Sequence, residues 1–146
     1  MAIDTPDVRP PELDEHVSPA MQRYLMVIAG AQRDGTVTPS AVARALACSA
    51  PSALEMLRRL ATAGMLVAPG RSPGGWRLTS RGHREVAAMR RRQSVLEQFL
   101  RISVGMDATE AAREAALLGP AVSSNLESRL RDVMWPSTRP CRPAED

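Results

Sequence analysis

The side chains best placed to do chemistry lie in one stretch, Thr38 to Leu60, with the sequence TPSAVARALACSAPSALEMLRRL. In its second half, short polar residues come first and arginines follow one to two helical turns later. Short polar side chains near a helix start can approach base edges, and later arginines can reach phosphates, as in a recognition helix bound in the major groove. The pattern predicts a DNA-reading face made of Ser52, Glu55, Met56, Arg58 and Arg59.

Two short helices joined by a tight turn would have to position this face. Thr38 can cap a helix that begins at Pro39, and Ser49 can cap a second helix with Pro51 near its start. We expect apolar faces at helical spacing, namely Val42, Ala45 and Leu46 in the first helix and Leu54, Leu57 and Leu60 in the second. The stretch is therefore predicted to be a helix-turn-helix, and an ordinary helical hairpin is the alternative.

A β-hairpin is expected directly after these helices. The apolar run Met65-Leu66-Val67 and the segment Trp76 to Thr79 are separated by the turn-forming sequence PGRSPGG. A hairpin in this place would be a wing, with Arg71 at its tip and Arg77 in its second strand beside the DNA backbone or minor groove. The complete set of predicted DNA contacts is Thr38, Ser49, Pro51, Ser52, Glu55, Met56, Arg58, Arg59, Arg71 and Arg77.

The distribution of charge agrees with this interpretation. All 19 basic residues are arginines, and twelve of them lie between Met21 and Arg92 against only Asp34, Glu55 and Glu85. From Gln93 to Arg142 the charges balance, with six arginines and six acids. A basic first half and a neutral second half suggest a polyanion-binding module joined to an oligomerisation module, and a merely solvated arginine surface is the alternative.

The rest of the chain is expected to be helical. Residues 1–17 form an acidic, proline-containing arm, and Ser18-Pro19 would begin a helix that carries Met21, Tyr24, Leu25 and Ile28 and ends by Gly30 or in the QRDG turn. A long helix follows from Ser80 to about Ser103, roughly 24 residues or about 36 Å. Its expected apolar positions are Val86, Met89, Val95, Leu96, Phe99, Leu100 and Ile102.

Two shorter helices should complete the second half. Asp107 and Glu110 form a capping box for a helix through Leu118, and Ser124 and Glu127 repeat it for a last helix. That last helix presents Leu126, Leu130, Val133 and Met134 on one side. We expect these small-residue and apolar faces to form a two-fold dimer interface, with burial inside one monomer as the alternative.

Composition excludes several classes of protein. A chain of 146 residues with 44% hydrophobic residues suits a globular protein, and it contains no apolar run long enough to span a membrane. Cys48 and Cys141 match no zinc or disulfide framework, so we expect a cytoplasmic protein. Cys48 precedes the recognition helix and could be a redox switch, although a part-buried turn cysteine is the simpler interpretation. No catalytic triad or phosphate loop is present, so an enzyme is not expected.

The order of these elements, together with ACSAPSALEMLRRL, GMLV, LTSRGH, LEQFL and VGMDATEAAREAALL, resembles the diphtheria toxin repressor and manganese transport regulator family from Met21 to Met134. The resemblance implies a homodimeric winged-helix repressor of a palindromic operator, with the two-domain architecture of the shorter members. It also implies sensing of divalent iron or manganese. At the positions of the family's metal ligands, however, this sequence has Arg23, Gln93, Glu97, Ala112, Ala116, Gly119 and Pro120.

Only Glu97 among those positions could bind a metal ion. Divalent ions need several carboxylate, imidazole or thiolate groups at one point, so the substitutions predict a regulator that does not depend on metal. We hypothesise that Arg23 replaces the ion by pairing with Glu97, or else points to solvent. A manganese- or iron-dependent repressor with a rearranged site, using Glu97, Cys141 or the acidic arm, remains an alternative. So does a co-regulator that binds protein partners through Leu54 and Glu55.

The predicted protein is thus mainly α-helical. It has an arm (residues 1–17), a winged helix-turn-helix (18–80), a helical dimerisation domain (81–136) and a C-terminal tail (137–146). Its predicted partners are double-stranded DNA, a second copy of the chain and an unidentified small-molecule effector, with no membrane and no cofactor.

Overall fold

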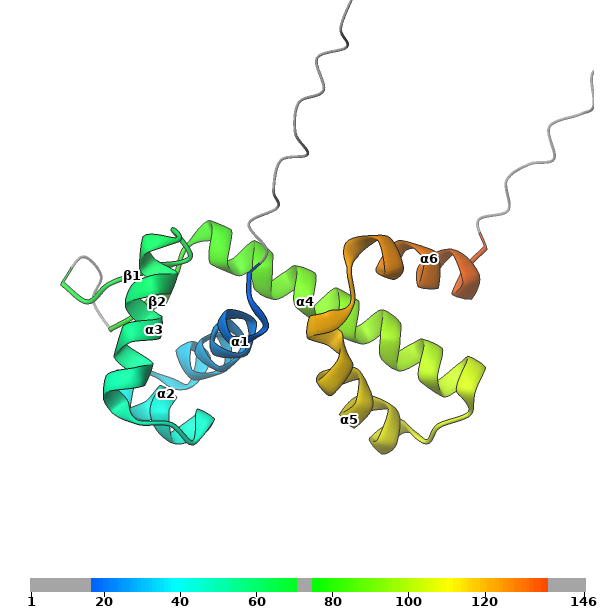
Figure 1. Cartoon of the computed structure of the whole chain (residues 1–146), viewed down its shortest axis with the longest axis horizontal. Helices are drawn as coiled ribbons and strands as arrows, with labels where there is room; N and C mark the ends of the chain where they lie inside the picture. Colours follow the sequence, from blue (N-terminus) through cyan, green and yellow to red (C-terminus); the bar gives the residue numbers. More distant parts are fainter. Residues whose placement is uncertain (1–16, 71–74, 137–146) are drawn as a thin grey trace, which may run out of the picture.

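The computed structural model describes residues 17–70 and 75–136 and is mainly helical. Figure 1 shows a winged helix-turn-helix half and a second helical half connected by one long helix, α4. The elements are α1 (Pro19–Asp34), α2 (Pro39–Leu46), α3 (Ala50–Thr62), β1 (Leu66–Val67), β2 (Arg77–Leu78), α4 (Ser80–Phe99), the π-helix η1 (Leu100–Val104), α5 (Ala108–Leu118), the 3-10 helix η2 (Gly119–Ala121) and α6 (Ser124–Met134). The predicted fold class is confirmed, and none of the described helices is long and apolar enough to cross a bilayer.

The first three helices begin where a hydroxyl side chain lies one or two residues before a proline. Ser18, Thr38 and Ser49 each accept a hydrogen bond from the backbone N–H three residues later, at 3.3, 3.2 and 3.3 Å. These bonds satisfy amides that have no partner inside the helix. Helix α1 ends in the predicted QRDG turn, with its last residue at Asp34. The turn between α2 and α3 contains Ala47 in the left-handed conformation, with φ of 52°.

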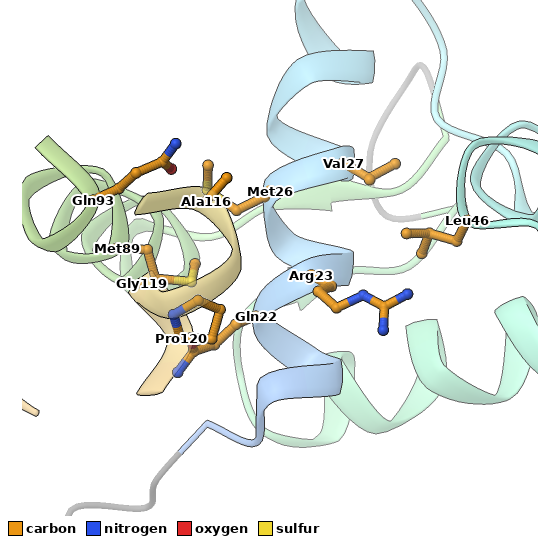
Figure 2. Close-up of a pocket in the computed structure, with 10 residues that line it drawn as sticks. All are labelled: Gln22, Arg23, Met26, Val27, Leu46, Met89, Gln93, Ala116, Gly119 and Pro120. Atoms are coloured by element: carbon orange, nitrogen blue, oxygen red, sulfur yellow. The ribbon is translucent and has the colours of Figure 1, made fainter. Parts of the chain in front are cut away.

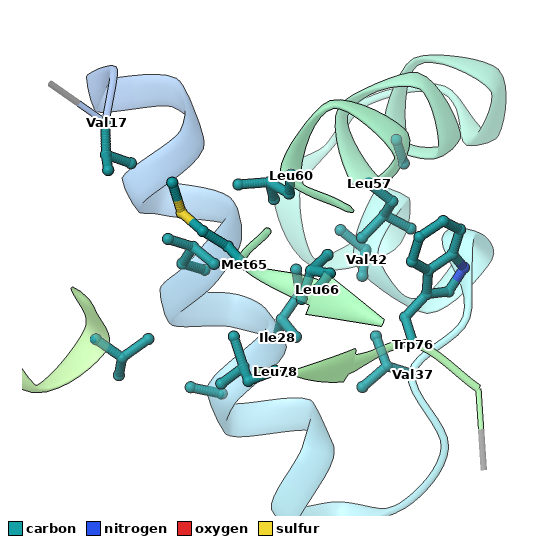
Figure 3. Close-up of a cluster of buried hydrophobic side chains, with 14 of the residues drawn as sticks. Val17, Ile28, Val37, Val42, Leu57, Leu60, Met65, Leu66, Trp76 and Leu78 are labelled. Carbon is teal, nitrogen blue, oxygen red and sulfur yellow. The ribbon is translucent and has the colours of Figure 1, made fainter. Parts of the chain in front are cut away.

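A hydrophobic core holds the winged half together (Figure 3). Leu25 and Ile28 of α1, Val42 of α2 and Leu57 and Leu60 of α3 are completely buried. Val17, which the sequence places in the N-terminal arm, is also buried in this core, and residues 1–16 lie outside the described part of the chain. One prediction for α2 was wrong: Ala45 is exposed, and the buried alanine is Ala43, which packs with Val42 in the hydrophobic core.

The wing is a short antiparallel hairpin in which Leu66 pairs with Leu78 and Val67 with Arg77. The loop before α2 adds a parallel bridge between Val37 and Gly75, and Trp76 N–H donates to the Val37 carbonyl at 3.2 Å. Gly75 has a φ of +86°, and a Cβ there would lie 2.5 Å from the Val37 carbonyl oxygen. Only glycine allows this approach, so the base of the wing is fixed to the helix-turn-helix.

The sequence LTSRG connects the wing to α4. Thr79 Oγ1 accepts from the Gly82 amide at 3.1 Å and donates to the Gly64 carbonyl at 2.6 Å, so one hydroxyl caps α4 and ties it to the end of α3. Gly82 lies so close to β1 that a Cβ would collide with the Met65 carbonyl oxygen. The motif therefore fixes the direction in which α4 leaves the wing.

The second half has its own small core. Leu96 and Leu100 from α4 and η1 pack against Ala111 and Ala115 of α5 and against Val122. The long helix runs near its predicted length, but its last turn is the π-helix η1, which ends at Gly105 with φ of 81°. Ile102, expected at an apolar position of the long helix, lies in η1 and is 71% exposed in the single chain.

Helix α6 begins differently from the prediction. Its cap is Ser123, which accepts from the Leu126 amide at 3.2 Å, and not Ser124. Glu127 is consequently turned inward, where its carboxylate lies 3.6 Å from Arg92 of α4 and 2.5 Å from Arg131 of α6. This buried ion pair ties α6 to the long helix.

Candidate nucleic-acid interface and the cavity behind it

The outward face of α3 is a polar stripe. Pro51, Ser52, Glu55, Arg58 and Arg59 are all exposed and lie at spacings of three and four residues. Helix α3 stands at the edge of the winged half, away from α5 and α6 (Figure 1). The polar residues near the helix start and the arginines later on it can meet a nucleic acid without rearrangement of the core.

Three predicted contact residues have structural roles as well. Met56 was predicted to face outward, but it is half-buried and packs against the hydrophobic core. It lies three residues after the buried Ala53 and one before the buried Leu57, so it borders the buried side of α3. Thr38 and Ser49 are exposed, yet their hydroxyls cap α2 and α3, and Ser49 Oγ also donates to Ser52 Oγ at 2.8 Å. The Thr38 hydroxyl only accepts in this bond, so its proton could be donated to a phosphate. The proton of Ser49 is already donated to Ser52, so the Ser52 hydroxyl is the one of the pair that could donate to a phosphate.

The wing contributes charge beside α3. Arg77 is exposed on β2, whereas Arg71 lies outside the described residues. Arg44 on α2 is also exposed and belongs to the same basic stretch, although it is not among the contacts that the sequence predicts. Because α2 has only eight residues, its sequence pattern does not determine the direction in which this side chain points.

A cavity of about 240 Å³ lies between α1 and the second half (Figure 2). Helix α1 supplies one wall, and α2, α4, α5 and η2 supply the others. The lining residues are Gln22, Arg23, Met26, Val27, Leu46, Met89, Gln93, Ala116, Gly119 and Pro120. Five of these ten are positions that the family resemblance assigns to metal ligands, so residues far apart in the sequence do converge here.

The cavity does not fit a metal ion. Its lining contains no carboxylate, imidazole or thiolate, and Arg23 brings a positive charge that would repel a cation. Glu97 and Ala112, the other two positions, do not line it. Within residues 17–70 and 75–136 no cluster of three histidine, cysteine or acidic residues could hold an ion.

The hypothesis that Arg23 pairs with Glu97 was wrong. No ion pair joins these two described residues, and the Arg23 side chain points away from α1 on the side where Leu46 lies (Figure 2). Glu97 lies one turn beyond Gln93, about 6 Å farther along α4, so it is past the cavity. Among the described residues, the ion pair that links the long helix to α6 joins Arg92 and Glu127.

Gln22 is the cavity residue with unsatisfied polarity. It is 9% exposed; its amide nitrogen donates to the Val17 carbonyl at 3.0 Å, and its Oε1 atom has no hydrogen-bond partner among the described residues. The sequence did not indicate that Gln22, Met26 or Met89 would be site residues. The residue pattern of one helix does not show where its packing against another helix leaves a cavity.

Cys48 is half-buried behind the start of α3. Its sulfur lies 3.3 Å from the hydroxyl of Tyr24 on α1, close enough for a hydrogen bond. This bond, followed by burial, raises the pKa of Tyr24 above its ordinary value of 10.0. The pair connects α1 to the turn of the helix-turn-helix.

Comparison with known families gives two matches. Residues 16–72 match the family model "Iron dependent repressor, N-terminal DNA binding domain". Residues 79–141 match "Iron dependent repressor, metal binding and dimerisation domain". The two matches follow each other in the order of the two structural halves. Comparison with curated proteins gave no significant match.

Solved structures of similar fold include a manganese-dependent transcriptional repressor in complex with manganese, 34% identical, with a TM-score of 0.65 over 78% of this chain and 52% of the other. The zinc-bound repressor ScaR is 25% identical, with a TM-score of 0.70 over 80% and 54% of the two chains. A hypothetical protein from Sulfolobus solfataricus, 18% identical, shares the fold over 80% of this chain and 88% of its own chain, with a TM-score of 0.66. The chain spans about half the length of the first two.

Proposed function

Because this chain belongs to the iron-dependent repressor family, we propose that it is a homodimeric DNA-binding transcriptional repressor that does not depend on a metal ion. Its operator would be a palindrome, since two identical recognition helices related by a two-fold axis read inverted half-sites. The protein is a regulator, without a catalytic role.

The observation that carries the DNA-binding part is the exposed stripe on α3. In this proposal the exposed Ser52 and Glu55 would read base edges and Arg58 and Arg59 would contact phosphates, beside a wing that carries Arg77. The hydrophobic core fixes the opposite face of α3, so the stripe is presented by a rigid helix.

Dimerisation is supported by apolar side chains that a single chain leaves exposed on η1, on α5, on α6 and at the residue that follows α6. They are Ile102, Val104, Leu117, Leu118, Leu126, Val133 and Trp135, with exposed fractions of 45% to 71%. Apolar surface of this extent in one half of a small protein favours association with a second copy.

Independence from metal is supported by the cavity. Five of the family's ligand positions meet in a space lined by apolar, amide and guanidinium groups, none of which replaces a carboxylate or imidazole. In this proposal the relation between the two halves is set by their packing and not by a coordinated ion.

Selection of bound DNA from a random pool, with and without a chelator, tests the proposal. We expect the same palindromic sequence in both arms. A palindrome recovered only without chelator would refute metal independence, and no enriched sequence in either arm would refute sequence-specific binding.

A metal-dependent repressor is the second candidate, because a relative 34% identical is described as manganese-dependent. Such a site would need ligands besides those in the cavity. Titration calorimetry with manganese and ferrous iron distinguishes the two: saturable binding of either ion at the level of one per chain would support the second candidate.

A further inference from the structure

We propose that the cavity between α1 and η2 binds a small carboxylate with an apolar body, of the aromatic-acid type, and that Arg23 anchors its charge. The proposal concerns binding; its consequence for DNA affinity rests on the proposed function.

The apolar part of the cavity determines the body of the ligand. Met26 and Val27 on α1, Leu46 on α2, Met89 on α4 and Pro120 on η2 surround the space. A closed apolar cavity of about 150 Å³ holds benzene, so the space of about 240 Å³, which is open to solvent on one side, is large enough for an aromatic ring with a short polar substituent at the opening. Two methionine side chains suit such a ring, because the thioether is polarisable and adapts its shape.

The polar part determines the charge of the ligand. Arg23 lines the cavity, is exposed, and forms no hydrogen bond or ion pair within the described residues. A guanidinium binds a carboxylate through two parallel hydrogen bonds, which gives both affinity and orientation. A cationic or neutral ligand would lack this interaction.

Gln22 provides an independent indication of a ligand. A buried amide oxygen without a donor costs free energy, so native structures rarely leave one unsatisfied. Gln22 lines the cavity and its nitrogen is already used, whereas its Oε1 has no partner and lies just beneath the accessible surface, so a donor in the cavity would reach it after a rotation of the amide. A hydroxyl substituent on the ring would satisfy this oxygen, so a hydroxylated aromatic acid should bind more tightly than the unsubstituted acid.

The position of the cavity explains how a ligand could act. Its walls come from α1, which packs on the helix-turn-helix, and from α4, α5 and η2, which form the second half (Figure 2). A ligand between these elements would alter the angle between the two halves, and in a dimer the distance between the two recognition helices.

Titration calorimetry of the full chain without DNA tests binding. The probes are benzoate, para-hydroxybenzoate and benzyl alcohol, which share a ring and differ in charge or hydroxyl. We expect saturable binding of both acids, tighter for para-hydroxybenzoate, and binding of benzyl alcohol at least about tenfold weaker than that of benzoate. Equal affinity for benzoate and benzyl alcohol, or no binding of either acid, would overturn the proposal.

Two pairs of variants locate the site. Arg23→Gln should weaken benzoate binding at least about tenfold, whereas Arg33→Gln, an exposed arginine of the same helix outside the cavity, should not. Ala116→Phe should fill the cavity and abolish binding, and Ala108→Phe on the same helix should leave it unchanged. Undiminished binding by Ala116→Phe, with its fold verified by circular dichroism, would place the ligand elsewhere and refute the inference.

A separate DNA measurement keeps the two proposals distinguishable. If benzoate binds by calorimetry but no operator is found, the repressor assignment fails and the cavity proposal stands. If an operator is bound with high affinity and none of the acids binds the chain, the cavity proposal alone fails.

Discussion

Tyr24 and Cys48 form a contact whose strength can be followed in solution. The chain contains a single tyrosine, so its ultraviolet titration reports on one group. We expect the folded chain to ionise Tyr24 above the ordinary pKa of 10.0, because the hydrogen bond with Cys48 and burial favour the neutral phenol. Cys48→Ala should lower the pKa of Tyr24 toward that value, and the chain unfolded in urea provides the reference.

The same pair makes a prediction about stability and pH. The unfolded chain ionises Tyr24 first as the pH rises past 10.0, because the pKa of the folded chain is higher. The contribution of this pair to the free energy of unfolding is therefore complete below pH 10.0. It is lost as the pH rises through the pKa of Tyr24 in the folded chain. Denaturant unfolding of wild type and Cys48→Ala should show a stability difference that shrinks over this range; a difference that grows would contradict the assignment.

Glu127 is the buried carboxylate of the second half. Glu127→Ala leaves Arg92 largely buried without its partner, so we expect a loss of about 3 kcal/mol in the free energy of unfolding. The matched control is Asp132→Ala on the same helix, an exposed position where the change should stay within about 0.5 kcal/mol. Urea denaturation measures both, and similar values for the two variants would contradict the buried ion pair.

Single residues also show how far the sequence alone could lead. Ser18, Thr38 and Ser49 were recognisable as caps, because a hydroxyl one or two residues before a proline is a local pattern that decides a local structure. The pairing of Arg23 with Glu97 was wrong, because a family pattern gives a position along a helix but not the direction of a long side chain. Ala43 could not be distinguished from Ala45, since both are small and α2 has only eight residues.

At the scale of elements, the junction between the wing and α4 makes the sharpest prediction. Gly82→Ala would drive a methyl group into the Met65 carbonyl, so we expect destabilisation of about 2 kcal/mol. Gly30 is also helical, but a Cβ added there would meet nothing within 4 Å, so Gly30→Ala should stabilise the chain by about 0.5–1 kcal/mol. Thermal unfolding of both variants tests the opposite signs; destabilisation of both would contradict this geometry.

The recognition helix α3 makes a prediction about salt. Arg58→Ala should reduce the slope of log K for DNA against log salt by about one, because one phosphate contact is lost. Arg113→Ala, an exposed arginine of α5 away from the interface, should leave the slope unchanged. Fluorescence anisotropy at several salt concentrations measures both slopes, and equal slopes would argue that Arg58 does not touch the backbone.

The elements themselves were largely predictable, and the space between them was not. Hydrophobic spacing, caps and glycine-rich turns located all six described α-helices and the hairpin, because each depends on neighbours in the sequence. The cavity depends on how α1, α4 and η2 pack against one another. Its lining residues are far apart in the sequence, because both Gln22 and Pro120 contribute to it. The start of α6 was misplaced by one residue because Ser123 and Ser124 are equally good caps.

For the whole molecule, the exposed apolar face predicts self-association. Val133→Glu and Leu117→Glu place charges at positions 67% and 69% exposed in the single chain, where a dimer interface would bury them. We expect sedimentation velocity to show monomers for these variants and dimers for wild type. Ala20→Glu, at an exposed position of α1, should remain dimeric; unchanged association of all variants would exclude this face as the interface.

Helix α4 supplies Val86 and Met89 to the first core and Leu96 and Leu100 (the start of η1) to the second, with no loop between them. Each residue of an α-helix contributes about 1.5 Å of rise and about 100° of rotation. A single insertion or deletion between Met89 and Leu96 would therefore turn the second half by more than a quarter of a circle against the first. The number of residues in this segment therefore sets the rotation of the second half relative to the first. We expect the chain to tolerate substitutions at the cavity better than a change in the length of this helix.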